Sequence, residues 1–153
     1  MKNHFKQLFD YDRHANHQLL KATTDNDSPA KAVGLLAHLL RSHQVWLPRL
    51  TGEPVTTGTL WPDWPAGELD AMIDENYTRW IAYLDSLKDE DFEKVISYKT
   101  LTDMAFENKL TDILSHVINH GTHHRAQAGQ QLLFAGATQL PATDLIFYLR
   151  DNK

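Results

Sequence analysis

The chain has 153 residues, of which 42% are hydrophobic and 23% are charged, a balance that predicts a single globular domain over residues 1–153. The 15 Lys and Arg against 20 Asp and Glu leave a formal net charge of −5, which argues against nucleic acid as a partner because phosphate binding needs a clustered positive surface. Since the chain has no cysteine, disulfides are excluded and any transition-metal site must use nitrogen or oxygen ligands.

The first predicted helix covers residues 3–23, where apolar residues recur on one face. This N-terminal segment is polar and amphipathic, and it lacks the uninterrupted apolar core of a signal peptide. No apolar run in the chain is long enough to span a bilayer. We therefore expect a cytoplasmic protein with no membrane partner.

The second predicted helix covers residues 29–50, with Ser28 as its N-cap and Pro29 at the first helical position. A long loop follows, rich in Thr, Gly, Trp and Pro and extending through Trp61 and Trp64. Connections of this length are often functional, so we expect the loop to cover a site or to face a second subunit. A third helix is predicted over residues 65–87.

The fourth predicted helix covers residues 110–135 and ends at Gly136, and a short helix over residues 142–150 closes the chain. Before the fourth helix, the VISY stretch at 95–98 and the segment after it predict a small hairpin. Together these elements predict an all-α fold, a four-helix bundle with a short C-terminal helix and a small hairpin before the last long helix.

Histidines are the most informative residues, because four of the nine fall between residues 116 and 124. Side chains four residues apart lie one above the other on a helix, so His120 and His124 can point at one ion. His116 and His120 have the same spacing, but all three cannot bind one ion because eight residues span about 12 Å of helix. A helical wheel places His120 and His124 at the edge of the apolar face, and His116 and His123 toward the polar face. The wheel therefore favours His120 and His124.

A third ligand is expected from a facing helix, as bundles normally build such sites between helices. The second helix offers His38 and His43. The wheel places His43 on the apolar stripe and His38 off it, so periodicity alone does not select His38. A histidine pair at this spacing without a neighbouring glutamate is a weak motif. Such pairs also occur as exposed polar residues on a helix, or as core histidines that are hydrogen-bonded.

The runs LLAHLLRSHQVWLPRLTG and LSHVINHGTHHRAQAGQQLLFAG resemble the DinB/YfiT-like family, and FDYDRHANHQLL and ATDLIFYL resemble its start and end. Ala126 stands where family members often have glycine. By position, the resemblance implies that His38, His120 and His124 bind a divalent metal ion, zinc or nickel, with His43 as a neighbour. It also implies a homodimer of four-helix bundles.

The resemblance implies a metal-dependent enzyme, a hydrolase or an S-transferase that uses a low-molecular-weight thiol with a small-molecule substrate. No catalytic residue follows from the sequence. His43 and His116 are candidates for contact with the metal ligands, and with Asp10 and Asp112 they are candidates for a general base. The alternative is a metal-binding stress-response protein without catalysis, and the simplest interpretation is a bundle whose histidines bind nothing.

Overall fold

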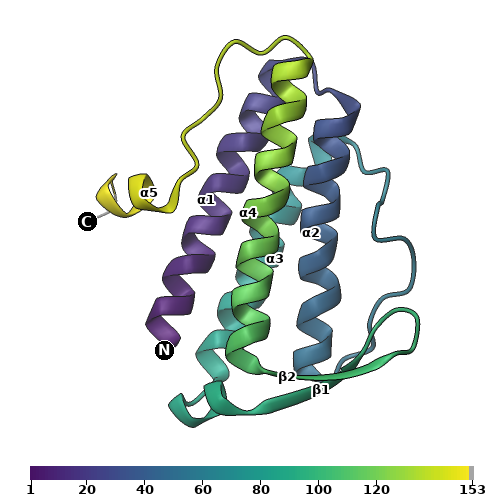
Figure 1. Cartoon of the computed structure of the whole chain (residues 1–153), viewed down its shortest axis with the longest axis vertical. Helices are drawn as coiled ribbons and strands as arrows, with labels where there is room; N and C mark the ends of the chain where they lie inside the picture. Colours follow the sequence, from purple (N-terminus) through teal and green to yellow (C-terminus); the bar gives the residue numbers. More distant parts are fainter. Residues whose placement is uncertain (152–153) are drawn as a thin grey trace.

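Four long helices form a bundle in the computed structural model, which describes residues 1–151. They are α1 (Lys2–Asp25), α2 (Ala30–Thr51), α3 (Ala66–Ser86) and α4 (Leu110–Phe134). In Figure 1, α4 lies in front between α1 and α2, and α3 packs behind against the same two helices. The predicted bundle is confirmed, with helix ends within two residues of those expected. Within residues 1–151, no helix combines the length and the apolar character needed to cross a membrane.

Short elements between α3 and α4 and after α4 complete the fold. A 3-10 helix, η1 (Asp89–Glu93), leads into an antiparallel hairpin of β1 (Val95–Lys99) and β2 (Ala105–Lys109), which lies across one end of the bundle (Figure 1). The C-terminal helix α5 (Leu145–Asp151) lies beside α1, with the Tyr148 ring next to that of Tyr11. The predicted hairpin and closing helix are therefore confirmed.

The core consists of two apolar clusters separated by a polar layer. The cluster near the hairpin includes Phe9 and Leu114, and the other includes Leu19 and Leu132. In α1, α2 and α4, buried polar residues fall between the members of the two clusters, and they include Asp12, Asn16, Ser42, His43, His124 and Arg125. This layer places polar and titratable side chains in the middle of the bundle, where water is largely excluded.

The start of α2 differs from the prediction. Pro29 is the N-cap and makes no side-chain cap bond, so Ser28 is not the capping residue. Ser28 instead has a φ of +49°, and its backbone N–H donates to the Thr23 carbonyl at 2.9 Å. The serine thus closes the end of α1, because a tight turn with positive φ at Asp27 and Ser28 separates the two helices.

Candidate metal centre

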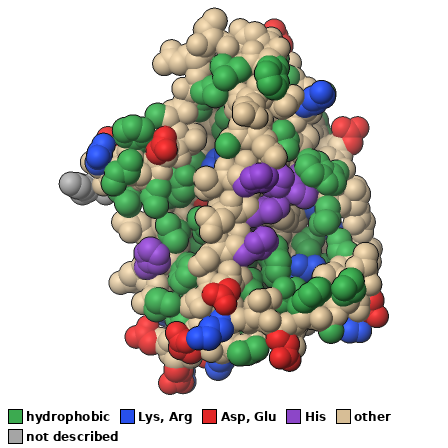
Figure 2. All heavy atoms as spheres, viewed as in Figure 1, with side chains coloured by type: hydrophobic (Ala, Val, Ile, Leu, Met, Phe, Trp, Pro, Cys, Tyr) green, Lys and Arg blue, Asp and Glu red, His purple; other side chains and the backbone are tan. Residues whose placement is uncertain are grey.

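Three histidines from two neighbouring helices meet in the middle of the bundle. His38 lies on α2, and His120 and His124 lie on α4. One ring nitrogen from each residue lies within 4.8 Å of the other two. Figure 2 shows histidine side chains gathered in the middle of the face formed by α4 and α2. His38 is 8% exposed and His124 9% exposed, so the site is sheltered but reachable from this face.

Two of the three rings are oriented by acceptors on their Nδ1 side. Nδ1 of His38 lies 2.7 Å from the Leu60 carbonyl oxygen, which can only accept a hydrogen bond. Nδ1 of His124 lies 2.7 Å from Oε1 of Gln127, which is also an acceptor. Both rings therefore carry their proton on Nδ1, and Nε2 is left with a free lone pair.

Ser42 imposes the same tautomer on the third ring. The Ser42 hydroxyl donates to the Leu39 carbonyl at 2.9 Å, so its oxygen is available to accept from Nδ1 of His120 at 3.1 Å. The Nε2 lone pairs of His120 and His124 then face each other across 3.1 Å. Two nitrogens each about 2.1 Å from one tetrahedral zinc ion would be about 3.4 Å apart. The residues thus fit a cation, which would relieve the repulsion between these lone pairs.

The electrostatics keep the rings of His120 and His124 neutral. Burial, together with smaller effects of the neighbouring His124, His38, His116 and His43, lowers the pKa of His120 to about 3. Burial also lowers the pKa of His124, partly opposed by its hydrogen bond to Gln127. Neutral imidazole is the form that binds a metal ion, so the site is ready to do so at neutral pH.

The loop between α2 and α3 covers one side of the histidines. The Trp61 ring stacks on the His38 ring, with the centroids 3.8 Å apart and the planes 6° from parallel. The buried guanidinium of Arg41 holds the loop, because its Nη2 donates to the Thr56 carbonyl at 2.6 Å. The loop thus covers the three histidines on this side, and its contact with a second subunit stays a prediction. Sequence reasoning missed Arg41, since its partners are backbone carbonyls.

The other histidines singled out in the sequence lie outside the three-histidine group. His43 is 3% exposed, and its Nε2 lies 3.6 Å from Oδ2 of Asp12. Its ring packs edge-on against the rings of Phe9 and Trp80. His116 is exposed, with its ring centroid 5.7 Å from that of His120. A catalytic role for either histidine stays a prediction.

The two carboxylates proposed as general bases are also separate from the three rings. Asp10 accepts a hydrogen bond from the Tyr77 hydroxyl at 2.6 Å, on the side of the bundle where α1 meets α3. Asp112 lies in the first turn of α4 and lines a pocket together with His116. Neither carboxylate hydrogen-bonds to His38, His120 or His124 within the part of the chain that the structure describes. A base role for either one stays a prediction.

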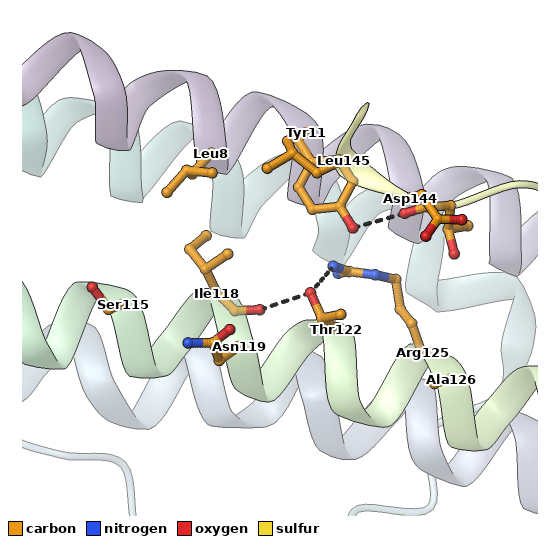
Figure 3. A pocket seen from close by; sticks show the side chains of 11 residues that line it. Leu8, Tyr11, Ser115, Ile118, Asn119, Thr122, Arg125, Ala126, Asp144 and Leu145 are labelled. Atoms are coloured by element: carbon orange, nitrogen blue, oxygen red, sulfur yellow. Dashed lines mark hydrogen bonds between the residues drawn. The ribbon is translucent and has the colours of Figure 1, made fainter. Parts of the chain in front are cut away.

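A buried ion pair lies in the same polar layer and was not recognised in the sequence. Nη1 of Arg125 donates to Asp12 and, at 2.9 Å, to Oδ1 of Asn16. A Cβ atom at Gly121 would lie 2.5 Å from the Asp12 carboxylate, so only glycine allows this approach. Figure 3 shows Arg125 extending from α4 toward α1, bonded to Thr122 beside a pocket of about 520 Å³. Asn16 thus supports the ion pair.

Protonation of His43 makes a testable contribution to stability. Burial lowers the pKa of His43 below its ordinary value, while Asp12 raises it and Arg125 lowers it. The unfolded chain therefore takes up a proton as pH falls below about 6.5, whereas the folded chain resists it. We expect the free energy of unfolding of the metal-free protein to fall between about pH 7 and 5, by at most about 1.4 kcal/mol per pH unit from this group. Urea denaturation of wild type and of His43→Leu should show a smaller slope in the variant.

The exposed His123→Gln variant is the matched control for that experiment, since its side chain lies at the surface. It should retain the wild-type slope. An unchanged slope in His43→Leu would show that His43 takes up its proton equally well in the folded and unfolded states.

Comparison with known families is consistent with this site. The sequence model of the DinB superfamily matches residues 8–128, which include all three clustered histidines. No curated protein and no solved structure gives a significant match. The resemblance seen in the sequence is therefore confirmed at the level of the superfamily.

Proposed function

The chain belongs to the DinB superfamily, and from this premise we propose that it is a metal-dependent enzyme. His38, His120 and His124 would hold one divalent ion through Nε2. The observation that carries this proposal is the convergence of three lone pairs whose rings are each held by a hydrogen bond at Nδ1. An all-imidazole donor set without thiolates suits zinc or nickel.

The chain's own residues prepare the site for chemistry. A bound ion would supply a Lewis acid that polarises a carbonyl group or acidifies a thiol or water. Ser42, Gln127 and the Leu60 carbonyl hold the three imidazoles in one tautomer, and Trp61 shields one side from water. Three ligands leave at least one coordination position for another group. We propose hydrolysis, or transfer of a low-molecular-weight thiol to a small-molecule substrate.

Reconstitution with metal tests this function. Metal-free protein and protein loaded with zinc or nickel are assayed on a panel of ester, amide and thiol-conjugation substrates. Turnover that appears only after loading supports the proposal. Stoichiometric metal with no turnover on the panel supports the alternative, a non-catalytic metal-binding protein of the stress response. No bound metal would contradict both.

Ser42 offers a more local test, because it touches His120 without being a ligand. Loss of such a supporting hydrogen bond typically weakens metal binding by about 10- to 100-fold. We expect that loss for Ser42→Ala, measured by competition with a chromogenic chelator. Ser115→Ala is the matched control, because Ser115 is an exposed serine whose hydroxyl donates to the Thr111 carbonyl of its own helix. Equal affinities in the two variants would argue against the assigned tautomer of His120.

The homodimer implied by the family resemblance stays a prediction. We expect a molar mass near twice that of the 17.5 kDa chain in size-exclusion chromatography with light scattering. A mass of one chain would rule out a stable dimer at that concentration.

A further inference from the structure

A small pocket lies beside His116, on the hairpin side of the three histidines. Its volume is about 210 Å³, and its lining residues are Trp46, Tyr98, Asn108, Asp112, Ile113 and His116. His116 connects it to the site, with ring centroids 5.7 Å from His120 and 5.2 Å from Trp46. A molecule bound to a metal ion at the histidines could therefore extend into this pocket.

Arg49 lies next to this pocket, against the rings of Trp46 and Tyr98 that form two of its walls. Its guanidinium carbon lies 4.6 Å from the centre of the Trp46 ring and 5.4 Å from that of Tyr98. Its Nε is buried without a hydrogen-bond partner, and Arg49 has no ion pair with any carboxylate of residues 1–151. Burial lowers its pKa, and only Tyr98 acts in the opposite direction. The last turn of a helix favours a cation, so the position of Arg49 in the last turn of α2 is suitable for its charge. That position does not explain why the arginine is half-buried without an anionic partner.

Geometry sets the length of a molecule that would reach both groups. Ser42, which bonds to His120, and Arg49 lie on the same helix, seven residues apart. Seven residues span about 10 Å of helix axis. A molecule with a metal-reactive group at one end would thus need its anionic group about that far away.

We propose that the pocket between the histidines and Arg49 binds the carboxylate-bearing end of a small substrate. This inference rests on the proposed function and names the substrate class of that site. Trp46 and Tyr98 supply aromatic walls for the connecting chain, and Arg49 supplies the charge. Asn108 adds a donor, because its side-chain oxygen already accepts from the Tyr98 hydroxyl at 2.9 Å and its amino group stays available.

Asp112 is the one lining residue whose charge opposes this ligand. It is exposed and lies in the first turn of α4, where a carboxylate is favourable for the helix. Removing its charge in Asp112→Asn should therefore strengthen binding of an anionic ligand by a few fold, a change opposite in sign to that expected for Arg49→Gln.

Thiols of equal length with different ends provide the test. Cobalt-substituted protein is titrated with mercaptohexanoate, mercaptohexanol and aminohexanethiol, and binding is followed by the thiolate-to-cobalt absorption band. We expect mercaptohexanoate to bind about tenfold more tightly than mercaptohexanol, the effect of one charge-assisted hydrogen bond. Arg49→Gln should abolish this preference, and Arg49→Lys should retain part of it. Arg79→Gln is the matched control, because Arg79 is an exposed arginine paired with Glu53, and it should keep the full preference.

The outcomes separate this inference from the proposed function. If no thiol produces the absorption band in wild type, the metal site itself is wrong. If all three thiols bind equally, or if the carboxylate preference survives in Arg49→Gln, only the assignment of the pocket is overturned. A preference for aminohexanethiol would assign the pocket to cations through Asp112 and would also overturn it.

Discussion

Replacing His120 with alanine is expected to abolish stoichiometric metal binding. Loss of a hydrogen bond that supports a ligand can weaken metal binding by about 100-fold. The variant loses one of the three ligands themselves, so we expect its metal affinity to fall by more than that. After dialysis against trace zinc or nickel, metal content measured by mass spectrometry should fall from near one ion per chain to less than about a tenth. Circular dichroism should show unchanged helix content, because His120 contributes a side chain at the edge of the core.

Thermal unfolding provides a second measurement of the same effect. An ion present at about 100 times its dissociation constant stabilises the folded state by about 2.7 kcal/mol. For a chain of this length, that corresponds to an increase in Tm of about 5–10 °C. Wild type should show the increase on adding metal, and His120→Ala should not. The control is His123→Ala, because His123 is exposed and outside the three-histidine group. Full metal content in His120→Ala would contradict the assigned ligands.

Replacing Asp12 with alanine is expected to cause the largest loss of stability. Asp12 and Arg125 are both 2% exposed, and they form an ion pair inside the bundle. Alanine at position 12 leaves the guanidinium buried without its anion, which typically costs about 3–5 kcal/mol. Urea denaturation of the metal-free protein at neutral pH should show that decrease in the free energy of unfolding.

Two further variants show whether the loss comes from the buried charge. Asp85→Ala removes an exposed carboxylate that pairs with Lys6, and it should change stability by about 1 kcal/mol or less. The double variant Asp12→Leu with Arg125→Met removes both charges, and it should recover much of the stability lost in Asp12→Ala. If the free energy of unfolding of Asp12→Ala lies within about 1 kcal/mol of the wild-type value, water or another group compensates for the missing carboxylate.

The sequence predicted the helices well because each carries a continuous apolar stripe. In α4, the residues predicted to face the core are buried, among them Leu114, Val117 and Leu132. The same wheel placed His120 and His124 at the edge of that face, where the structure has them. Only local periodicity was needed for these predictions, and a long amphipathic helix satisfies it along its whole length.

The choice between His38 and His43 could not come from periodicity. From Leu36 to His43, every residue of α2 is buried, because the loop after α2 covers the face that would otherwise meet solvent. A wheel assumes one exposed face, so it misjudged His38, which lies under Trp61. The family resemblance pointed to His38, and His38 is the residue of α2 whose ring nitrogen lies within 4.8 Å of those of His120 and His124.

The buried ion pair had a signal in the sequence that was not used. Between Phe9 and Leu19 the apolar stripe of α1 is interrupted by Asp12 and Asn16, which are four residues apart and thus on one face. The partner, Arg125, is 113 residues from Asp12, and no local rule connects the two. The carbonyl of Leu60 had no signal at all, because every residue has a carbonyl group.

X-ray absorption at the metal edge of zinc- or nickel-loaded protein measures the ligands of the bound ion. We expect one ion per chain, with three imidazole nitrogens at about 2.0–2.1 Å, and loss of one imidazole contribution in any surviving complex of His38→Ala. A spectrum without imidazole scattering, or one that is unchanged when His38 is replaced, would contradict a centre built from α2 and α4 together.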